Sequence, residues 1–183
     1  MEFDAATITA SAAVIAALVA IIAVAIQIRV FRATISTDVI LKLQSEFDSE
    51  RMRRVRASAA KSLKEPNGTE GSTDLDEVLN FFDALSLLVY RGVLDRELVW
   101  HYFYHWVHHY WDAASSYINS VRDKSPEIWS DIERLHRQLL SVENERCKRP
   151  YNDPDMISQE KRDEFLDIEI GLGGAGGIDG KSG

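Results

Sequence analysis

The chain begins with a long apolar segment. From Ala5 to Ile28 no side chain is charged, whereas the rest of the chain mixes apolar and charged positions. An α-helix rises about 1.5 Å per residue, so a helix over 5–28 is long enough to cross a hydrocarbon core of about 30 Å. A cleaved signal peptide is the alternative, but the acidic start MEFD and the length of the run argue against it. We therefore predict a short extracytoplasmic N-terminus, 1–4, followed by a transmembrane helix, 5–28.

The rest of the chain has helical periodicity. Apolar residues recur at helical spacing from Thr37 to Leu63. Their phase slips between Phe47 and Val55, so this stretch is either two helices or one helix that rotates its buried face. A loop rich in Gly, Pro and Asn, 65–73, precedes a helix that ends at Gly92. No alternating strand pattern competes, so we predict an all-α fold: a bundle of about four to five helices over 29–170.

Capping residues mark the later helices. Asp95 predicts the start of a helix that runs to about Lys124, and Ser125 followed by Pro126 predicts the N-cap and first turn of another, ending near Lys148. A short acidic helix is expected over 158–170, and the glycine-rich segment 171–183 is expected to be a flexible tail. The side chains expected in the core include Phe82, Leu85, Phe103, Trp106, Tyr110 and Trp129.

Charge predicts the orientation of the anchor. Glu2 and Asp4 precede the apolar run and Arg29 and Arg32 follow it, so the positive-inside rule places the C-terminal domain in the cytoplasm. The lone Cys147 agrees with a reducing compartment. All 21 Lys and Arg but only 27 of the 29 acidic residues follow the apolar run, which leaves that part at −6 and gives no indication of nucleic-acid binding.

An arginine cluster follows in the first part of the soluble chain. On a helix that continues straight from the membrane, Arg51 would stand about 33 Å beyond Arg29, too far to meet the lipid surface. We expect surface charge or ion pairs with Glu46, Asp48 and Glu50. The cluster comprises Arg51, Arg53, Arg54 and Arg56.

The segment 101–111, HYFYHWVHHYW, holds four of the five histidines and six aromatic rings. At about 100° per residue the rings gather on one side of a helix, as a core stripe, and the histidines lie on the other, polar side. His101, His105 and His108 are spaced by four and three residues, with Glu97 and Asp112 at the two ends of this stripe. Such neighbours can share a metal ion, but one helix face does not easily supply the ligands that zinc needs. A solvated face and a pH-sensing stripe are the alternatives.

Small residues line one face of the predicted transmembrane helix. Small side chains let two helix backbones approach closely in lipid, and they predict packing against a second copy of the chain or another membrane protein. The face comprises Thr9, Ala12, Ala13, Ala16, Ala20, Ala23 and Gln27.

Several stretches resemble a bacterial family of uncharacterised helical proteins, which often follow one N-terminal transmembrane helix. They are SEFDSERMRRVRASA, the FF pair at Phe81 and Phe82, RGVLD at 91–95, and the YW pair at Tyr110 and Trp111. The resemblance runs from about Val39 to Leu140. It implies a bacterial membrane protein and assigns no catalytic residue.

We therefore expect a single-pass protein of the cell membrane that presents a cytosolic helical interaction domain. The expected partners are membrane lipid and a second copy or another membrane protein. No cofactor and no catalytic residue are indicated, since nucleotide-binding and hydrolase motifs are absent. Two alternatives stay open: a membrane-tethered metalloprotein or enzyme that uses the stripe from Glu97 to Asp112, and a membrane-active effector that assembles through its span.

Overall fold

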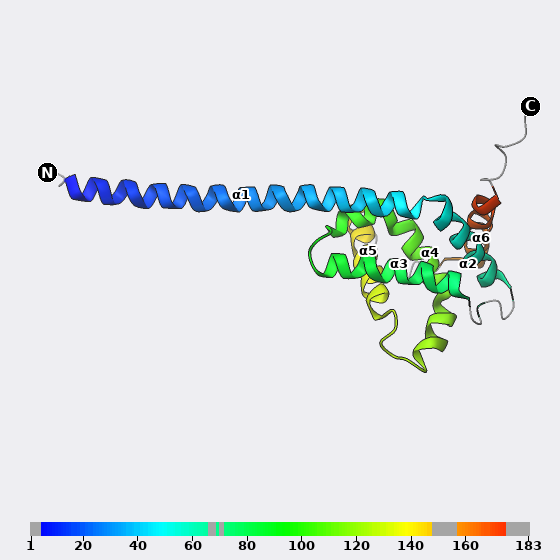
Figure 1. Cartoon of the computed structure of the whole chain (residues 1–183). Helices are drawn as coiled ribbons and strands as arrows, with labels where there is room; N and C mark the ends of the chain where they lie inside the picture. Colours follow the sequence, from blue (N-terminus) through cyan, green and yellow to red (C-terminus); the bar gives the residue numbers. More distant parts are fainter. Residues whose placement is uncertain (1–4, 66–68, 70–71, 148–156, 175–183) are drawn as a thin grey trace, which may run out of the picture.

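The computed structural model describes residues 5–65, 69, 72–147 and 157–174, without the side chains of 5–17, 32, 33 and 174. This part of the chain is all-α, as predicted, and contains six helices (Figure 1). They are α1 (Ala5–Phe47), α2 (Glu50–Lys64), α3 (Thr73–Tyr90), α4 (Arg96–Arg122), α5 (Ser130–Cys147) and α6 (Gln159–Gly174).

Helix α1 has two parts with different surroundings. Its N-terminal part extends away from the other helices, and its C-terminal part packs on them (Figure 1). The segment Leu18–Phe47 is long and apolar enough to cross a membrane, and its most apolar stretch is not buried by the protein. From Ser36 onward α1 contributes buried side chains to the bundle, including Ile40 and Phe47. One continuous helix therefore joins the apolar segment to the bundle.

The phase slip after Phe47 marks the end of α1. The chain turns at Asp48 and Ser49, and the Ser49 side chain accepts a hydrogen bond from the Met52 amide at 3.2 Å, which caps α2. Of the two possibilities that the sequence left open, the structure has two helices. The turn lets α2 bury its own face, which includes Met52, Ala59 and Ala60.

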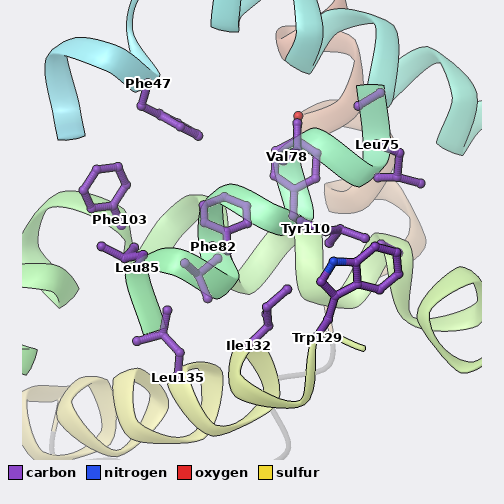
Figure 2. Close-up of a cluster of buried hydrophobic side chains, with 14 of the residues drawn as sticks. Phe47, Leu75, Val78, Phe82, Leu85, Phe103, Tyr110, Trp129, Ile132 and Leu135 are labelled. Carbon is purple, nitrogen blue, oxygen red and sulfur yellow. The ribbon is translucent and has the colours of Figure 1, made fainter. Parts of the chain in front are cut away.

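The bundle core is aromatic and aliphatic. Side chains from α1, α3, α4 and α5 converge in it (Figure 2). Phe47 contacts the rings of Phe81, Phe82 and Phe103 at centroid distances of 5.0 to 5.8 Å. Five of the six predicted core residues are buried, whereas Trp106 is only partly buried. Its indole N–H donates to Glu169 at 3.2 Å, so its ring lies at the edge of the core beside a carboxylate.

The predicted start of the helix after Ser125 was wrong. Residues 126–129 form turns, and α5 begins at Ser130. Arg122 donates from Nη2 to the Trp129 carbonyl at 2.6 Å and from Nε to the Ile128 carbonyl at 3.1 Å, and these bonds hold the turn in place. Trp129 has a φ of 53°, a strained left-handed conformation, and its buried ring donates to Asn80 at 2.9 Å. Tertiary contacts therefore set this boundary.

The sequence predicted the end of α3 correctly and the end of α6 too early. Helix α3 ends before Gly92, which has a φ of 67° that glycine adopts without strain, as the sequence predicted. Helix α6 extends to Gly174, four residues beyond the predicted Ile170. Residues 175–183 of the expected flexible tail lie outside the described residues.

Candidate functional site

The histidines on the predicted polar face of α4 lie against two different helices, α5 and α6. His101 and His105 are exposed, as expected for a polar face, but His108 is only 8% exposed. The expectation that His108 faces a polar surface was wrong because α5 covers it. His108 Nδ1 lies 2.8 Å from Nε2 of His136 on α5, while the His105 ring contacts Phe165 of α6.

The buried His108 and the half-buried His136 form a stacked pair between aromatic rings. Their imidazole planes differ by 5°, Tyr104 stacks on His108, and Trp111 stacks on His136. Burial, and then the proximity of His108, lower the pKa of His136 to about 4, against an opposing effect of Asp112. His136 is therefore neutral at pH 7. The short contact is a hydrogen bond in which one ring donates and the other accepts.

The other polar groups of the stripe are engaged in ion pairs with other helices. Glu97 pairs with Arg146 of α5 at 3.0 Å, and Asp112 pairs with Arg162 of α6 at 2.7 Å. Among the described residues, no group of three or more His, Cys, Asp or Glu side chains is placed to hold a metal ion. That His101, His105 and His108 bind a metal therefore stays a prediction. In this structure the side chains of the stripe connect α4 with α5 and α6.

A buried ion pair lies on the opposite flank of α4. Arg56 of α2 and Glu169 of α6 are each 2% exposed, and Arg56 Nε lies 3.3 Å from Glu169 Oε2. Tyr110 donates its hydroxyl to the same oxygen at 3.1 Å, and Trp106 donates to Oε1 at 3.2 Å. The Arg56 guanidinium also lies 4.1 Å from the centre of the Phe47 ring, within cation–π range. Residues of α1, α2, α4 and α6 thus meet around one charged pair.

The prediction for the arginine cluster holds at two positions and fails at a third. Arg51 and Arg54 are exposed and lie within ion-pair distance of Glu46 and Glu50, as expected. Arg56 is buried instead. A signal for this exists in the sequence, because Arg56 shares the helical face of Met52 and Ala59, four residues before it and three after it. An arginine on an apolar stripe needs a buried partner, and the sequence gives no indication that a helix 113 residues away supplies it.

A groove of about 810 Å³ opens between α1 and the turn that joins α3 to α4. Ser36 and Thr37 of α1 form one wall, and Gln138 and Arg146 of α5 contribute another. The apolar part of the lining comes from Val89, Val93, Leu94 and Leu98, and the remaining polar part includes Asp95, Arg96, Glu97 and His101. The groove therefore offers charged groups beside an apolar floor, a combination that suits an amphipathic ligand.

Comparisons with known proteins give one match. The family model of a domain of unknown function (DUF4760) matches residues 7–139, from the start of the apolar segment to α5. Helix α6, which supplies Glu169, lies beyond the matched residues. No curated protein and no solved structure matches significantly. Because the match covers well over half of the chain, this protein belongs to the DUF4760 family of domains of unknown function.

Proposed function

We propose that this protein is a single-pass protein of the cell membrane that presents its helical bundle in the cytoplasm for interaction with a second copy or another membrane protein. One observation carries the proposal. Large apolar side chains all around α1, before it meets the bundle, are more than half exposed: Leu18, Val19, Ile21, Ile22, Val24, Ile26, Ile28, Val30 and Phe31. A helix that is apolar on all sides and covered by no protein is stable where lipid covers it.

The orientation rests on charge. Acidic Glu2 and Asp4 precede the apolar segment, and Arg29 and Arg32 follow it, which favours a cytoplasmic bundle. The test is a pair of full-length fusions at the C-terminus, one to a reporter active only in the cytoplasm and one to a reporter active only outside it. We expect activity from the first alone. Activity from the second would reverse the proposed topology, and recovery of the chain in the soluble fraction would refute the membrane anchor.

The partner proposal rests on the small-residue face of α1. Ala20, Ala23 and Gln27 are exposed, and no described residue of the bundle covers them. The side chains of Thr9, Ala12, Ala13 and Ala16 lie outside the described residues. Close backbone approach at such a face is a main source of helix association in lipid.

Crosslinking of the full chain in membranes tests this association. Replacing Ala16 and Ala20 together by Ile is expected to reduce the dimer severalfold, since the larger side chains hold the backbones apart. Leu18→Ala is the control and is expected to leave dimer formation unchanged. An isoleucine variant that associates as well as the parent would show that this face is not the interface.

A further inference from the structure

Helix α6 packs on α2 and α4, at the end of the bundle furthest from the N-terminus of α1 (Figure 1). Its buried residues Phe165, Leu166 and Glu169 share one helix face, as do the anchor residues of a helix that binds in the groove of another protein. The side chains of α2 and α4 that α6 covers or pairs with form what we call the α6-binding surface: Arg56, Ala57, Lys64, Tyr110 and Asp112.

The contacts of α6 have the composition of an interface between two proteins. Phe165 is a buried aromatic anchor whose ring packs edge-on against the ring of Tyr110, at a centroid distance of 5.3 Å. Two partly exposed ion pairs border the buried face: Lys64 with Asp167 at 2.6 Å and Asp112 with Arg162 at 2.7 Å. A buried aromatic or arginine anchor with polar groups at the rim is typical of surfaces that bind a partner.

Arg56 is the group of this surface whose hydrogen-bonding capacity α6 uses least. It is 2% exposed, and its Nε lies within ion-pair distance of Glu169, yet Nε and Nη1 form no hydrogen bond with any residue that the structure describes. Glu169 accepts from Tyr110 and Trp106 instead. A carboxylate that meets a guanidinium in its plane can accept two parallel hydrogen bonds. A partner carboxylate in that geometry would therefore bind Arg56 more strongly than α6 does.

The α6-binding surface lies within the matched domain, whereas α6 does not. The family model matches 7–139, which includes α2 and α4, and it ends before α6 begins at Gln159. The aromatic cluster around Phe47, Phe82 and Phe103 is assembled from α1, α3 and α4. The centre of the core therefore does not depend on α6.

This surface is far from the membrane boundary that the apolar segment predicts. Arg56 lies over the ring of Phe47, the last residue of α1. Phe47 is about 28 Å along the helix axis from Ile28, where the uncharged run ends. That distance is more than about three Debye lengths at physiological salt, so the occupant of the surface comes from the aqueous phase and not from the lipid.

We propose that the α6-binding surface is the docking site of the bundle for an amphipathic helix in the cytoplasmic part of another membrane protein, and that α6 occupies the site until such a helix displaces it. The helix that fits has an aromatic residue and, four positions later, a carboxylate, as Phe165 and Glu169 are placed in α6. The proposal names the contact surface of the interaction domain proposed above, and it rests on that function.

Cleavage of the full chain between α5 and α6 tests the proposal. A protease site is inserted before Ile157, the chain is cut in detergent, and the released α6 is exchanged for a fluorescent peptide of residues 157–174. We expect the cut chain to keep cooperative thermal unfolding without α6 and to bind the peptide reversibly. Loss of the folded state on removal of α6 would make this helix an integral part of the fold and overturn the proposal. A folded cut chain that binds no peptide would overturn it as well.

Two variant peptides test recognition of the carboxylate. Glu169→Gln should bind roughly 30-fold more weakly than the parent peptide, because it removes one member of a buried charge pair. Glu164→Gln changes an exposed position of the same helix and should bind like the parent peptide. Equal binding of the two variants would show that Arg56 does not select a carboxylate, against the proposal.

Crosslinking of the uncut chain tests a second copy as the alternative occupant. A carbodiimide joins an amine to a carboxylate in contact with it, so it should couple Lys64 to Asp167 within one chain. The same crosslink in a dimer would show that two copies exchange α6, and would overturn the proposed partner. Membrane fractionation of the uncut chain reports on the anchor alone, which separates a failed docking site from a failed anchor.

Discussion

Helix α4 buries a polar contact on each of two flanks, and the two contacts differ in charge. Toward α2 and α6 it encloses the Arg56–Glu169 ion pair, whose carboxylate accepts from Tyr110 and Trp106. Toward α5 it buries His108 against the half-buried His136, which is neutral at pH 7. The interface with α2 and α6 requires that both Arg56 and Glu169 keep their charges. The interface with α5 requires that His136 stays unprotonated.

Because of this difference, the two interfaces are expected to be destabilised by different changes. Removing one member of a buried ion pair leaves the other charge without compensation, at a cost well above the net value of the pair. His136 carries no charge at pH 7, so its protonation in acid can disrupt the contact with His108 without any mutation. The α2–α6 side is therefore expected to be sensitive to substitution and the α4–α5 side to pH.

The largest expected effect is at the ion pair. Glu169→Leu should lower the free energy of unfolding by about 3 to 5 kcal/mol, because Arg56 would stay buried without its carboxylate. Denaturant unfolding of the full chain in detergent measures this loss. Glu164→Leu, on an exposed position of the same helix, is the control and should change stability by less than about 0.5 kcal/mol.

A second variant distinguishes lost charge balance from lost packing. Arg56→Met/Glu169→Leu removes both charges, so it should recover most of the stability that Glu169→Leu loses. A double variant as unstable as the single one would show that hydrogen bonds and shape, rather than the uncompensated charge, dominate this interface.

The next effect is the response to acid. The pKa of His136 is about 4 in the folded chain and about 6.5 when unfolded, so below pH 6.5 the unfolded state binds a proton that the folded state excludes. Stability should therefore fall by about 2 to 3 kcal/mol between pH 6.5 and 4, then stop falling on account of this group. Unfolding of the parent and of His136→Gln across this range measures the effect. The two chains should differ in slope, and identical slopes would contradict the assignment.

The smallest effect concerns how closely α6 approaches α2. A Cβ atom added to Gly173 would lie 2.4 Å from the Ala57 Cβ, so Gly173→Ala should destabilise the chain by about 1 to 3 kcal/mol. Gly171 has open space around it, and Gly171→Ala should stabilise α6 by up to about 1 kcal/mol. Thermal unfolding of the two variants compares them directly. Equal shifts for both would mean that α6 does not pack on α2 as described.

The sequence by itself determined the features that arise from local chemistry. An uncharged run of sufficient length predicted the apolar helix, and periodicity predicted an all-α bundle. Asp95 predicted the start of α4 because an N-cap carboxylate acts on amides two and three residues away. The break after Phe47 was visible as a phase slip, although the sequence left one or two helices open.

Only the tertiary structure decided which polar residues of these helices are buried. His108 lies on the polar side of α4 by periodicity, yet α5 brings His136 to within 2.8 Å of it. Arg56 belonged to an apparent surface cluster, and its partner Glu169 comes from the last helix. Helix α5 starts at Ser130, not after Ser125, because Trp129 has a left-handed φ of 53°, which an α-helix does not accommodate, and contacts with Arg122 and Asn80 hold it there. Periodicity describes one helix at a time, whereas the burial of a side chain depends on the neighbouring helix, and long-range contacts between helices carry no local signal.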